Sequence, residues 1–227
     1  MISAPHAGGV FVTGTDTGAG KTRVAVALLR ACAAGGVAAV GMKPVAAGIE
    51  PGQTVNDDVL ALDAAGAVRA PLADRNPYAF SEPIAPHVAA AREGRRIDLA
   101  AIADAYRRLA AVAGFVVVEG AGGPLVPLSQ GTDMLDIARV LRLPVILVVG
   151  LRLGCLSQAL ACELAIRARG LVLAGWVANR VDPSMACADE SVAAIAERLP
   201  APMLADLAFG SQGPISERTV ALLRREA

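Results

Sequence analysis

The fold of this chain is decided by a stretch near its start, residues 10–22, which reads VFVTGTDTGAGKT. The apolar residues 10–12 predict a short strand, and the closing lysine and threonine begin a helical pattern. A glycine-rich turn between a strand and a helix presents backbone N–H groups that bind phosphate oxygens, and glycine allows their close approach. Five residues separate Gly14 from Gly20, one more than in the standard phosphate-binding loop, so this loop is a variant.

Strand and helix patterns alternate outward from this stretch. Strands are predicted at 10–12, 37–42, 115–118, 144–149, 171–178 and 203–207, and helices at 21–34, 56–65, 99–113, 133–141, 157–169, 188–199 and 216–225. The proline-rich stretch 71–86 is predicted to be a loop with short turns. The alternation predicts an α/β fold of the P-loop NTPase type, with a mostly parallel sheet and helices on both faces. The length predicts a single domain, residues 1–227.

Composition argues against several classes of partner. The formal net charge is zero, which favours neither nucleic acid nor a membrane surface. Residues 1–9 lack the features of a signal peptide, and the apolar run 143–151 is too short to span a bilayer. Four cysteines occur without a Cys-x-x-Cys pair, so we expect neither a zinc site nor disulfides. We therefore expect a soluble cytoplasmic protein with reduced, buried thiols.

Polar and glycine-rich segments follow the predicted strands, at 13–22, 43–48, 119–123, 150–157 and Asn179. Ligands of such sheets lie beyond the C-terminal ends of the strands, so these segments are the candidate site. Lys21 is placed to neutralise the β- and γ-phosphates of a nucleotide, and the Thr22 hydroxyl to ligate Mg²⁺. Thr17 lies in the loop and is a further phosphate donor.

A magnesium ion bridging phosphates needs carboxylates nearby. Glu119 ends a predicted strand and Asp58 begins a predicted helix. The alternatives are a surface acid for Glu119 and a helix-capping acid for Asp58. Lys43 follows a strand and is placed to reach a terminal phosphate; the alternative is a surface lysine. Lys21 and Lys43 are the two lysines of a chain that otherwise uses arginine, and a compact ammonium suits a crowded phosphate site.

Two further positions have weaker support. The helix start at Gly154, Cys155 and Leu156 has free N–H groups for a substrate carboxylate, or is an ordinary helix start. Asn179 either reads an adenine edge or is a turn residue. We reject Cys155 as a nucleophile because neither histidine has a context that makes it a partner base.

Seven motifs together resemble the dethiobiotin synthetases. They are GTDTGAGKT (14–22), KPV (43–45), NPY (76–78), EGAGG (119–123), PVILVVG (144–150), LGC (153–155) and GWVAN (175–179). The resemblance runs from residue 10 to residue 207, and the order of the motifs is more specific than the phosphate loop alone.

That resemblance implies a reaction and its cofactors. The substrates would be ATP, carbon dioxide or bicarbonate, and 7,8-diaminopelargonic acid, with Mg²⁺ required. One amine would take up carbon dioxide as a carbamate, and ATP would phosphorylate it. The second amine would then attack the mixed anhydride to close a cyclic urea, releasing phosphate. The resemblance also implies a homodimer.

The resemblance further implies roles for individual residues. The catalytic residues would be Lys43, Lys21 and Thr17, and the metal ligands Thr22, Asp58 and Glu119. The nucleotide would be held by Gly18, Ala19, Gly20, Lys21, Thr22, Arg23, Asp58, Glu119, Gly120, Ala121, Gly122, Asn179, Arg180, Ala208, Phe209 and Gly210. The substrate would contact Ala47 and, from the neighbouring subunit, Gly154, Cys155 and Leu156.

Three positions depart from the family pattern. Relatives often carry a serine that touches the substrate where this chain has Ala47. Gly18 stands where some relatives have glutamate, and residues 208–210 differ from the Pro-Trp type near the base, so the nucleotide preference stays open.

Two other classes of protein compete with this assignment. The ATP-dependent amidases of corrin synthesis need a long extension that this chain has no room for. The partitioning ATPases resembling MinD or ParA usually carry an early loop lysine that residues 13–19 lack.

Overall fold

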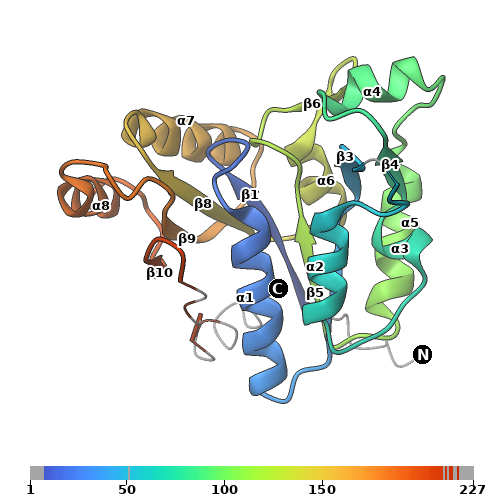
Figure 1. Cartoon of the computed structure of the whole chain (residues 1–227), viewed down its shortest axis with the longest axis horizontal. Coiled ribbons are helices and arrows are strands. Elements are labelled where there is room, and N and C mark those ends of the chain that lie inside the picture. Colours follow the sequence, from blue (N-terminus) through green and yellow to red (C-terminus); the bar gives the residue numbers. More distant parts are fainter. Residues whose placement is uncertain (1–7, 51, 212, 214, 217–218, 220–227) are drawn as a thin grey trace.

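The computed structural model describes residues 8–50, 52–211, 213, 215–216 and 219. Its centre is a six-stranded sheet in the order β10-β9-β8-β1-β5-β2, in which all neighbouring strands are parallel (Figure 1). The strands are β1 (Gly8–Gly14), β2 (Ala39–Met42), β5 (Phe115–Glu119), β8 (Val145–Leu151), β9 (Leu173–Arg180) and β10 (Met203–Leu207). The predicted parallel α/β sheet is confirmed.

Helices cover both faces of this sheet, as predicted. The side chains of Val10 and Val12 in β1 lie on one face of the sheet. This face is covered by α1 (Lys21–Ala34) and α2 (Asp57–Ala65). Phe11 points to the opposite face, because successive side chains of a strand alternate. That face is covered by α5 (Leu99–Ala110), α6 (Met134–Leu141), α7 (Cys155–Ala168) and α8 (Ala188–Ala196).

The parallel register of the strands brings the candidate segments together at the C-terminal end of the sheet. β1 lies between β5 and β8, with Val12 opposite Glu119 and Gly14 opposite Val148. Because the strands are parallel, their C-terminal ends open on the same side, where the phosphate loop leaves β1. The fold therefore gathers segments that lie far apart in the sequence.

The prediction of a loop with short turns over residues 71–86 holds only in part. This stretch contains α3 (Leu72–Arg75) and β4 (Tyr78–Phe80), and its last residue begins α4 (Pro86–Arg92). β4 pairs with β3 (Val45–Ala47) in a small parallel sheet, and α3 packs against α5. A second unpredicted pair is the antiparallel β6 (Pro127–Ser129) and β7 (Thr132–Asp133). Such short elements show too little periodicity to be recognised, and pairing with distant residues stabilises them.

Three further expectations concern the C-terminal helix, the cysteines and membrane-spanning segments. The helix predicted at 216–225 lies almost wholly outside the described residues. The expectation of buried thiols holds for Cys32, Cys155 and Cys162, but Cys187 is exposed, in the turn that begins α8. No helix among the described residues is long and apolar enough to cross a bilayer.

Candidate active site

The loop between β1 and α1 is held in a wrapped conformation by backbone and side-chain hydrogen bonds. Thr15 Oγ1 accepts a hydrogen bond of 3.2 Å from the N–H of Gly150, which fixes the loop to the end of β8. Lys21 Nζ donates to the carbonyl of Asp16 at 3.0 Å. Gly20 has φ 91°, a conformation that residues with a Cβ rarely adopt. The start of α1 therefore faces the loop, as phosphate binding requires.

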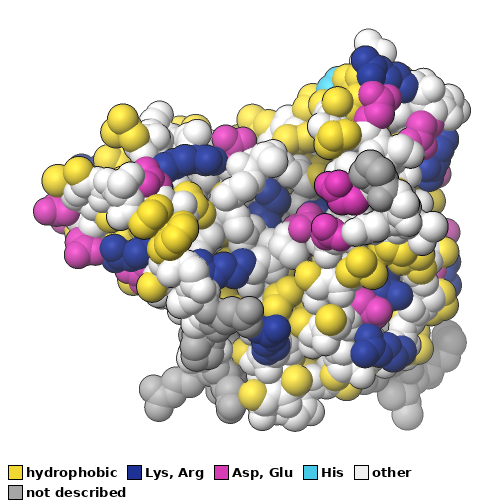
Figure 2. Space-filling view, viewed as in Figure 1, with side chains coloured by type: hydrophobic (Ala, Val, Ile, Leu, Met, Phe, Trp, Pro, Cys, Tyr) yellow, Lys and Arg dark blue, Asp and Glu magenta, His cyan; other side chains and the backbone are white. Residues whose placement is uncertain are grey.

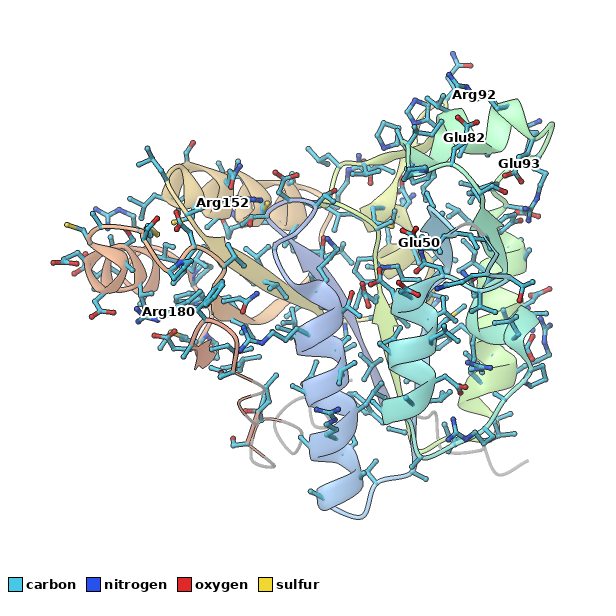
Figure 3. All side chains as sticks on the ribbon, viewed as in Figure 1. Glu50, Glu82, Arg92, Glu93, Arg152 and Arg180 are labelled. Carbon is cyan, nitrogen blue, oxygen red and sulfur yellow. The ribbon has the colours of Figure 1, made fainter. Side chains whose placement is uncertain are left out.

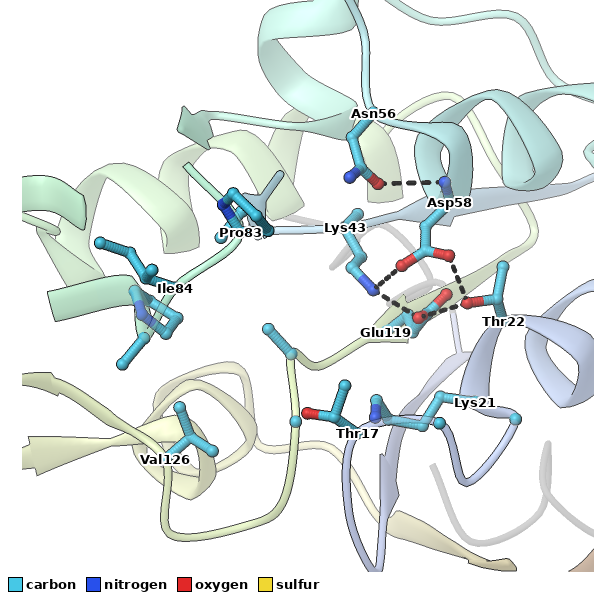
Figure 4. A pocket seen from close by; sticks show the side chains of 17 residues that line it. Thr17, Lys21, Thr22, Lys43, Asn56, Asp58, Pro83, Ile84, Glu119 and Val126 are labelled. Atoms are coloured by element: carbon cyan, nitrogen blue, oxygen red, sulfur yellow. Dashed lines mark hydrogen bonds and ion pairs between the residues drawn. The ribbon is translucent and has the colours of Figure 1, made fainter. Parts of the chain in front are cut away.

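Lys43 meets two carboxylates beside this loop. Its Nζ lies 2.6 Å from Oδ2 of Asp58 and 2.5 Å from Oε1 of Glu119. The Thr22 hydroxyl oxygen lies 2.7 Å from Oδ1 of Asp58 and 2.9 Å from Oε1 of Glu119, so its one proton can be donated to either carboxylate (Figure 4). Lys43 is 4% exposed and Glu119 is fully buried, so neither is a surface residue. The four side chains that the sequence proposed as one site do converge.

Opposite charges in this network stabilise one another, whereas like charges oppose one another. Burial works against the charged form of Lys43, but the carboxylates of Glu119 and Asp58 outweigh it and raise the pKa of Lys43 above its usual value. Burial likewise disfavours ionised Asp58, yet Lys43 and the Thr22 hydroxyl hold its pKa below the usual value. Burial raises the pKa of Glu119. Burial first, and then the charge of Lys43, lower the pKa of Lys21 to about 8. An ammonium at Lys43 and a carboxylate at Asp58 are thus the favoured forms.

The same residues fit a magnesium ion. Glu119 Oε2 is buried and has no hydrogen-bond partner among the described residues. Thr22, Asp58 and Glu119 supply hydroxyl and carboxylate oxygens, which Mg²⁺ prefers. No cluster of three or more His, Cys, Asp and Glu ligands occurs in the described part of the chain. At phosphate sites Mg²⁺ takes its other ligands from phosphate and water, so two carboxylates suffice for an ion that arrives with a nucleotide.

These groups line a cavity of about 650 Å³. In Figure 2 the centre of this face is hollowed, and basic and acidic side chains meet in the hollow. One wall is polar, from the loop, Lys43 and the carboxylates; the other is mainly apolar and includes Pro83, Ile84, Pro86 and Val126 (Figure 4). Thr17, Gly18, Ala47, Ala121 and Gly122 also line the cavity, as expected of the site. The apolar wall was missed, because residues 83–86 belong to the stretch predicted as loop.

Two asparagines that the sequence analysis left without a role position this network. Asn76 Nδ2 donates to the carbonyls of Lys43, at 2.7 Å, and Tyr78, at 3.0 Å. Asn56 caps α2 by accepting from the N–H of Asp58 at 3.0 Å, and donates to the carbonyl of Gly48 at 2.6 Å. The motif at 76–78 was the available signal for Asn76, but its contact with Lys43 spans 33 residues.

A second cavity, of about 600 Å³, lies on the other side of Thr22. Arg23, Arg180, Phe209 and Gly210, all predicted to contact the nucleotide, line it with Ser211. Arg180, labelled in Figure 3, forms ion pairs with Asp206 and Asp189.

Asn179 is buried near the end of β9 and lines neither cavity. Its Nδ2 donates to the Ala19 carbonyl at 2.8 Å, and its Oδ1 accepts from Arg23. The adenine contact of Asn179 stays a prediction.

Other predicted residues do not reach either cavity. Ala19 and Gly120 are buried, and a Cβ on Gly120 would lie 2.9 Å from Phe11 Cζ, so this glycine serves packing. Gly154, Cys155 and Leu156 begin α7 and line neither cavity. They would contribute to the site only from a second copy, which stays a prediction.

Sequence comparison identifies the family. A family model described as an AAA domain matches residues 8–211. The chain is 54% identical over 196 residues to the ATP-dependent dethiobiotin synthetase BioD of Aromatoleum aromaticum, covering 86% of this chain and 87% of that protein. It is 52% identical over 201 residues to the protein of the same name from Nitrosospira multiformis, covering 88% of each. The chain belongs to the dethiobiotin synthetase family. Membership makes it an ATP-dependent ligase and decides against the amidase and partitioning alternatives.

Solved structures agree on the fold. The MinC:MinD cell division complex of Aquifex aeolicus matches 96% of this chain and 86% of that chain, with a TM-score of 0.53 and 14% identity. The signal recognition particle receptor FtsY of Elizabethkingia anophelis matches 98% of this chain and 68% of that chain, with a TM-score of 0.56 and 16% identity. At these identities the likeness concerns the P-loop fold alone.

Proposed function

We propose that the protein makes the cyclic urea of dethiobiotin from 7,8-diaminopelargonic acid, carbon dioxide and ATP, as a step of biotin biosynthesis. Family membership supports ATP-dependent dethiobiotin synthesis. The observation that carries the detailed proposal is the single cavity in which the phosphate loop, Lys43, Asp58 and Glu119 face a mainly apolar wall. That arrangement suits a reaction between a triphosphate and a largely aliphatic diamine.

The proposed chemistry has three steps. One amine nitrogen attacks carbon dioxide and loses a proton, giving a carbamate. A carbamate oxygen then attacks the γ-phosphorus of ATP, and ADP leaves. The second amine attacks the carbonyl carbon of the resulting anhydride; the C–O bond to phosphate breaks, the nitrogen loses its proton, and the ring is closed as a urea.

The lysines and Thr17 are assigned to the phosphoryl transfer. Negative charge moves among phosphoryl oxygens in this step, so positioned cations and hydrogen-bond donors supply most of the catalysis. Lys21 opens α1 at the loop, and Lys43 enters from the end of β2 on the opposite side. Thr17 lines the same cavity (Figure 4). We assign Lys21 and Thr17 to the nucleotide phosphates and Lys43 to the group being transferred.

We assign Thr22, Asp58 and Glu119 to Mg²⁺, whose bound charge would neutralise the β- and γ-phosphate oxygens. Thr22 lies where the two cavities meet, so a triphosphate in the first cavity would extend past it. We accordingly assign the second cavity to the nucleoside.

We also propose a homodimer with substrate contacts from the partner. Leu153 is 96% exposed, and Leu156 and Leu164 are also exposed, which leaves an apolar patch at the start and along one side of α7. A partner covering this patch would bring Gly154 and Cys155 near a subunit boundary. Light scattering after gel filtration tests this; a monomer at micromolar concentration contradicts it. We further propose a cytoplasmic location, which is in keeping with a biosynthetic enzyme family.

One assay tests the reaction. The protein is incubated with ATP, Mg²⁺, bicarbonate and the diamine, and phosphate and cyclic urea are quantified together. We expect equal amounts of the two products, and phosphate release that depends on the diamine. Phosphate release that ignores the diamine, or release without urea, overturns the proposal.

A further inference from the structure

The side chain of Arg23 joins three separate parts of the molecule. It projects from the first turn of α1, and its Nη1 donates to Asn179 Oδ1 at 2.5 Å. Its Nη2 donates to the carbonyl of Ala208 at 2.8 Å and to Ser211 Oγ at 2.9 Å, and also contacts the Ser211 carbonyl. One guanidinium thus connects the phosphate-loop helix, the end of β9, and residues 208–211.

Residues 208–211 are linked to α1 by this contact. The chain enters the segment from Leu207 and returns to the core at Ile215, both of which are buried. Between these anchors Phe209 is 58% exposed. Among the described residues, the other hydrogen bonds of the segment are local, from the N–H of Ser211 to the Ala208 carbonyl and from the N–H of Gly213 to Ser211 Oγ. Among the hydrogen bonds of the described residues, those from Arg23 link the outer part of the segment to the rest of the protein.

Asn179 is held in one orientation by the same arginine. Its Nδ2 faces the carbonyl of Ala19 at 2.8 Å, while its Oδ1 faces the cationic guanidinium. A flipped amide would place oxygen against the Ala19 carbonyl and N–H groups against Arg23, losing both hydrogen bonds. Hydrogen bonds to charged groups are among the stronger ones in proteins, so Arg23 supplies much of this restraint.

Arg23 also lines the second cavity, next in the sequence to the residue that the two cavities share. Thr22 lines both of them, and Arg23, the next residue, lines the second with Phe209, Gly210 and Ser211. If the triphosphate lies in the first cavity, as the proposed function holds, the nucleoside lies against the segment that Arg23 fastens. The guanidinium is itself partly desolvated there, which lowers the pKa of Arg23 without removing its charge.

We infer that Arg23 is a positioning residue for the nucleoside half of ATP: its side chain holds residues 208–211 and the Asn179 amide in the binding-competent arrangement. This inference rests on the nucleotide site of the proposed function. It assigns to the side chain a role separate from phosphate binding by the loop. Hence the affinity for ATP, but not the affinity for the phosphate chain alone, depends on Arg23.

The test compares two ligands that share a triphosphate chain, of which only one carries a nucleoside. Equilibrium binding of ATP and of inorganic tripolyphosphate is measured by calorimetry, with Mg²⁺, for the native protein and Arg23→Met. We expect Kd for ATP to rise about tenfold or more, because several hydrogen bonds from one charged group are lost, while Kd for tripolyphosphate stays within about twofold. In turnover assays KM for ATP should rise with kcat little changed, and KM for the diamine should not move.

Three further variants keep the test sharp. Arg23→Lys, which can reach some of the acceptors but not all, should recover part of the ATP affinity. Ser211→Ala removes one acceptor and should cost less than about threefold. Arg198→Met, in which the lost arginine lies after α8 and bonds Ala194 instead, serves as the matched control and should bind ATP normally. A cooperative thermal unfolding transition is required of each variant, as evidence that the variant is folded.

Two results overturn the inference. One is unchanged ATP affinity in Arg23→Met; the other is an equal loss of ATP and tripolyphosphate affinity, which would place the defect in the phosphate loop. The proposed function fails by a different result, the absence of urea from the native protein, and the binding measurements do not depend on that outcome.

Discussion

The two cavities that meet at Thr22 are built in different ways. The first is formed at the ends of parallel strands, where Lys43 and Glu119 are buried and paired. The second is formed by the outer side of α1 and an exposed segment to which Arg23 donates hydrogen bonds. The sheet itself therefore fixes the first cavity, whereas the side chain of Arg23 ties together parts of the second. Changes at the first should appear mainly in kcat, and changes at the second mainly in nucleotide affinity.

The largest expected effect is at Lys43. Lys43→Met removes the ammonium from the reacting end of the cavity, and we expect kcat for urea formation to fall about 10²- to 10³-fold, as for other lost transition-state donors. ATP affinity, measured by calorimetry, should change much less. A fall in kcat of less than about tenfold would remove Lys43 from the chemistry. Circular dichroism is needed alongside, because Glu119 loses its buried cationic partner in this variant.

Gly20→Ala is expected to damage both cavities together. Gly20 has φ 91°, and an added Cβ would lie 2.0 Å from Asn179 Nδ2. Relieving that contact must displace either the loop or the asparagine, and backbone strain of this kind costs on the order of 1–3 kcal/mol. ATP and tripolyphosphate should both bind at least about tenfold more weakly. Selective loss of ATP binding alone would contradict this, and would mean that the loop absorbs the change without cost.

Asn76→Ala tests whether the hydrogen bond from Asn76 to the Lys43 carbonyl holds Lys43 in position. Asn76 is 7% exposed, and its replacement leaves the carbonyls of Lys43 and Tyr78 without this donor. We expect the free energy of unfolding in urea to drop by about 1–3 kcal/mol. We also expect kcat to fall severalfold while KM for ATP is unchanged. A rise in KM for ATP without loss of kcat would show that Asn76 serves the nucleotide instead.

Arg180→Met should have the smallest effect. Arg180 lines the second cavity, but its guanidinium is engaged by Asp206 and Asp189 near the surface. Exposed ion pairs of this kind contribute about 0–1 kcal/mol. We expect KM for ATP to change less than about threefold. A tenfold rise would show that Arg180 contacts the nucleotide directly, and would weaken the contrast with Arg23.

Sequence reasoning succeeded for the first cavity for a specific reason. Lys43, Glu119 and the phosphate loop each follow a predicted strand, and parallel strands bring such positions to one edge whatever their distance in the chain. It failed where short elements are stabilised by distant partners, as in β4, which pairs with β3 and helps to place the apolar wall. It named Arg23 as one of the residues that hold the nucleotide but did not predict its contacts with residues 208–211, because such side-chain contacts leave no periodic pattern.

The sequence by itself determined the phosphate loop, the alternating strands and helices, and the family, because these depend on local pattern and on motifs in a fixed order. Tertiary structure alone decided that Lys43 lies between Asp58 and Glu119, that Asn76 holds its carbonyl, and that Arg23 fastens residues 208–211. The reason is physical. Backbone preferences are set by neighbouring residues, whereas a hydrogen bond between side chains depends on distances that only the packed sheet and helices fix.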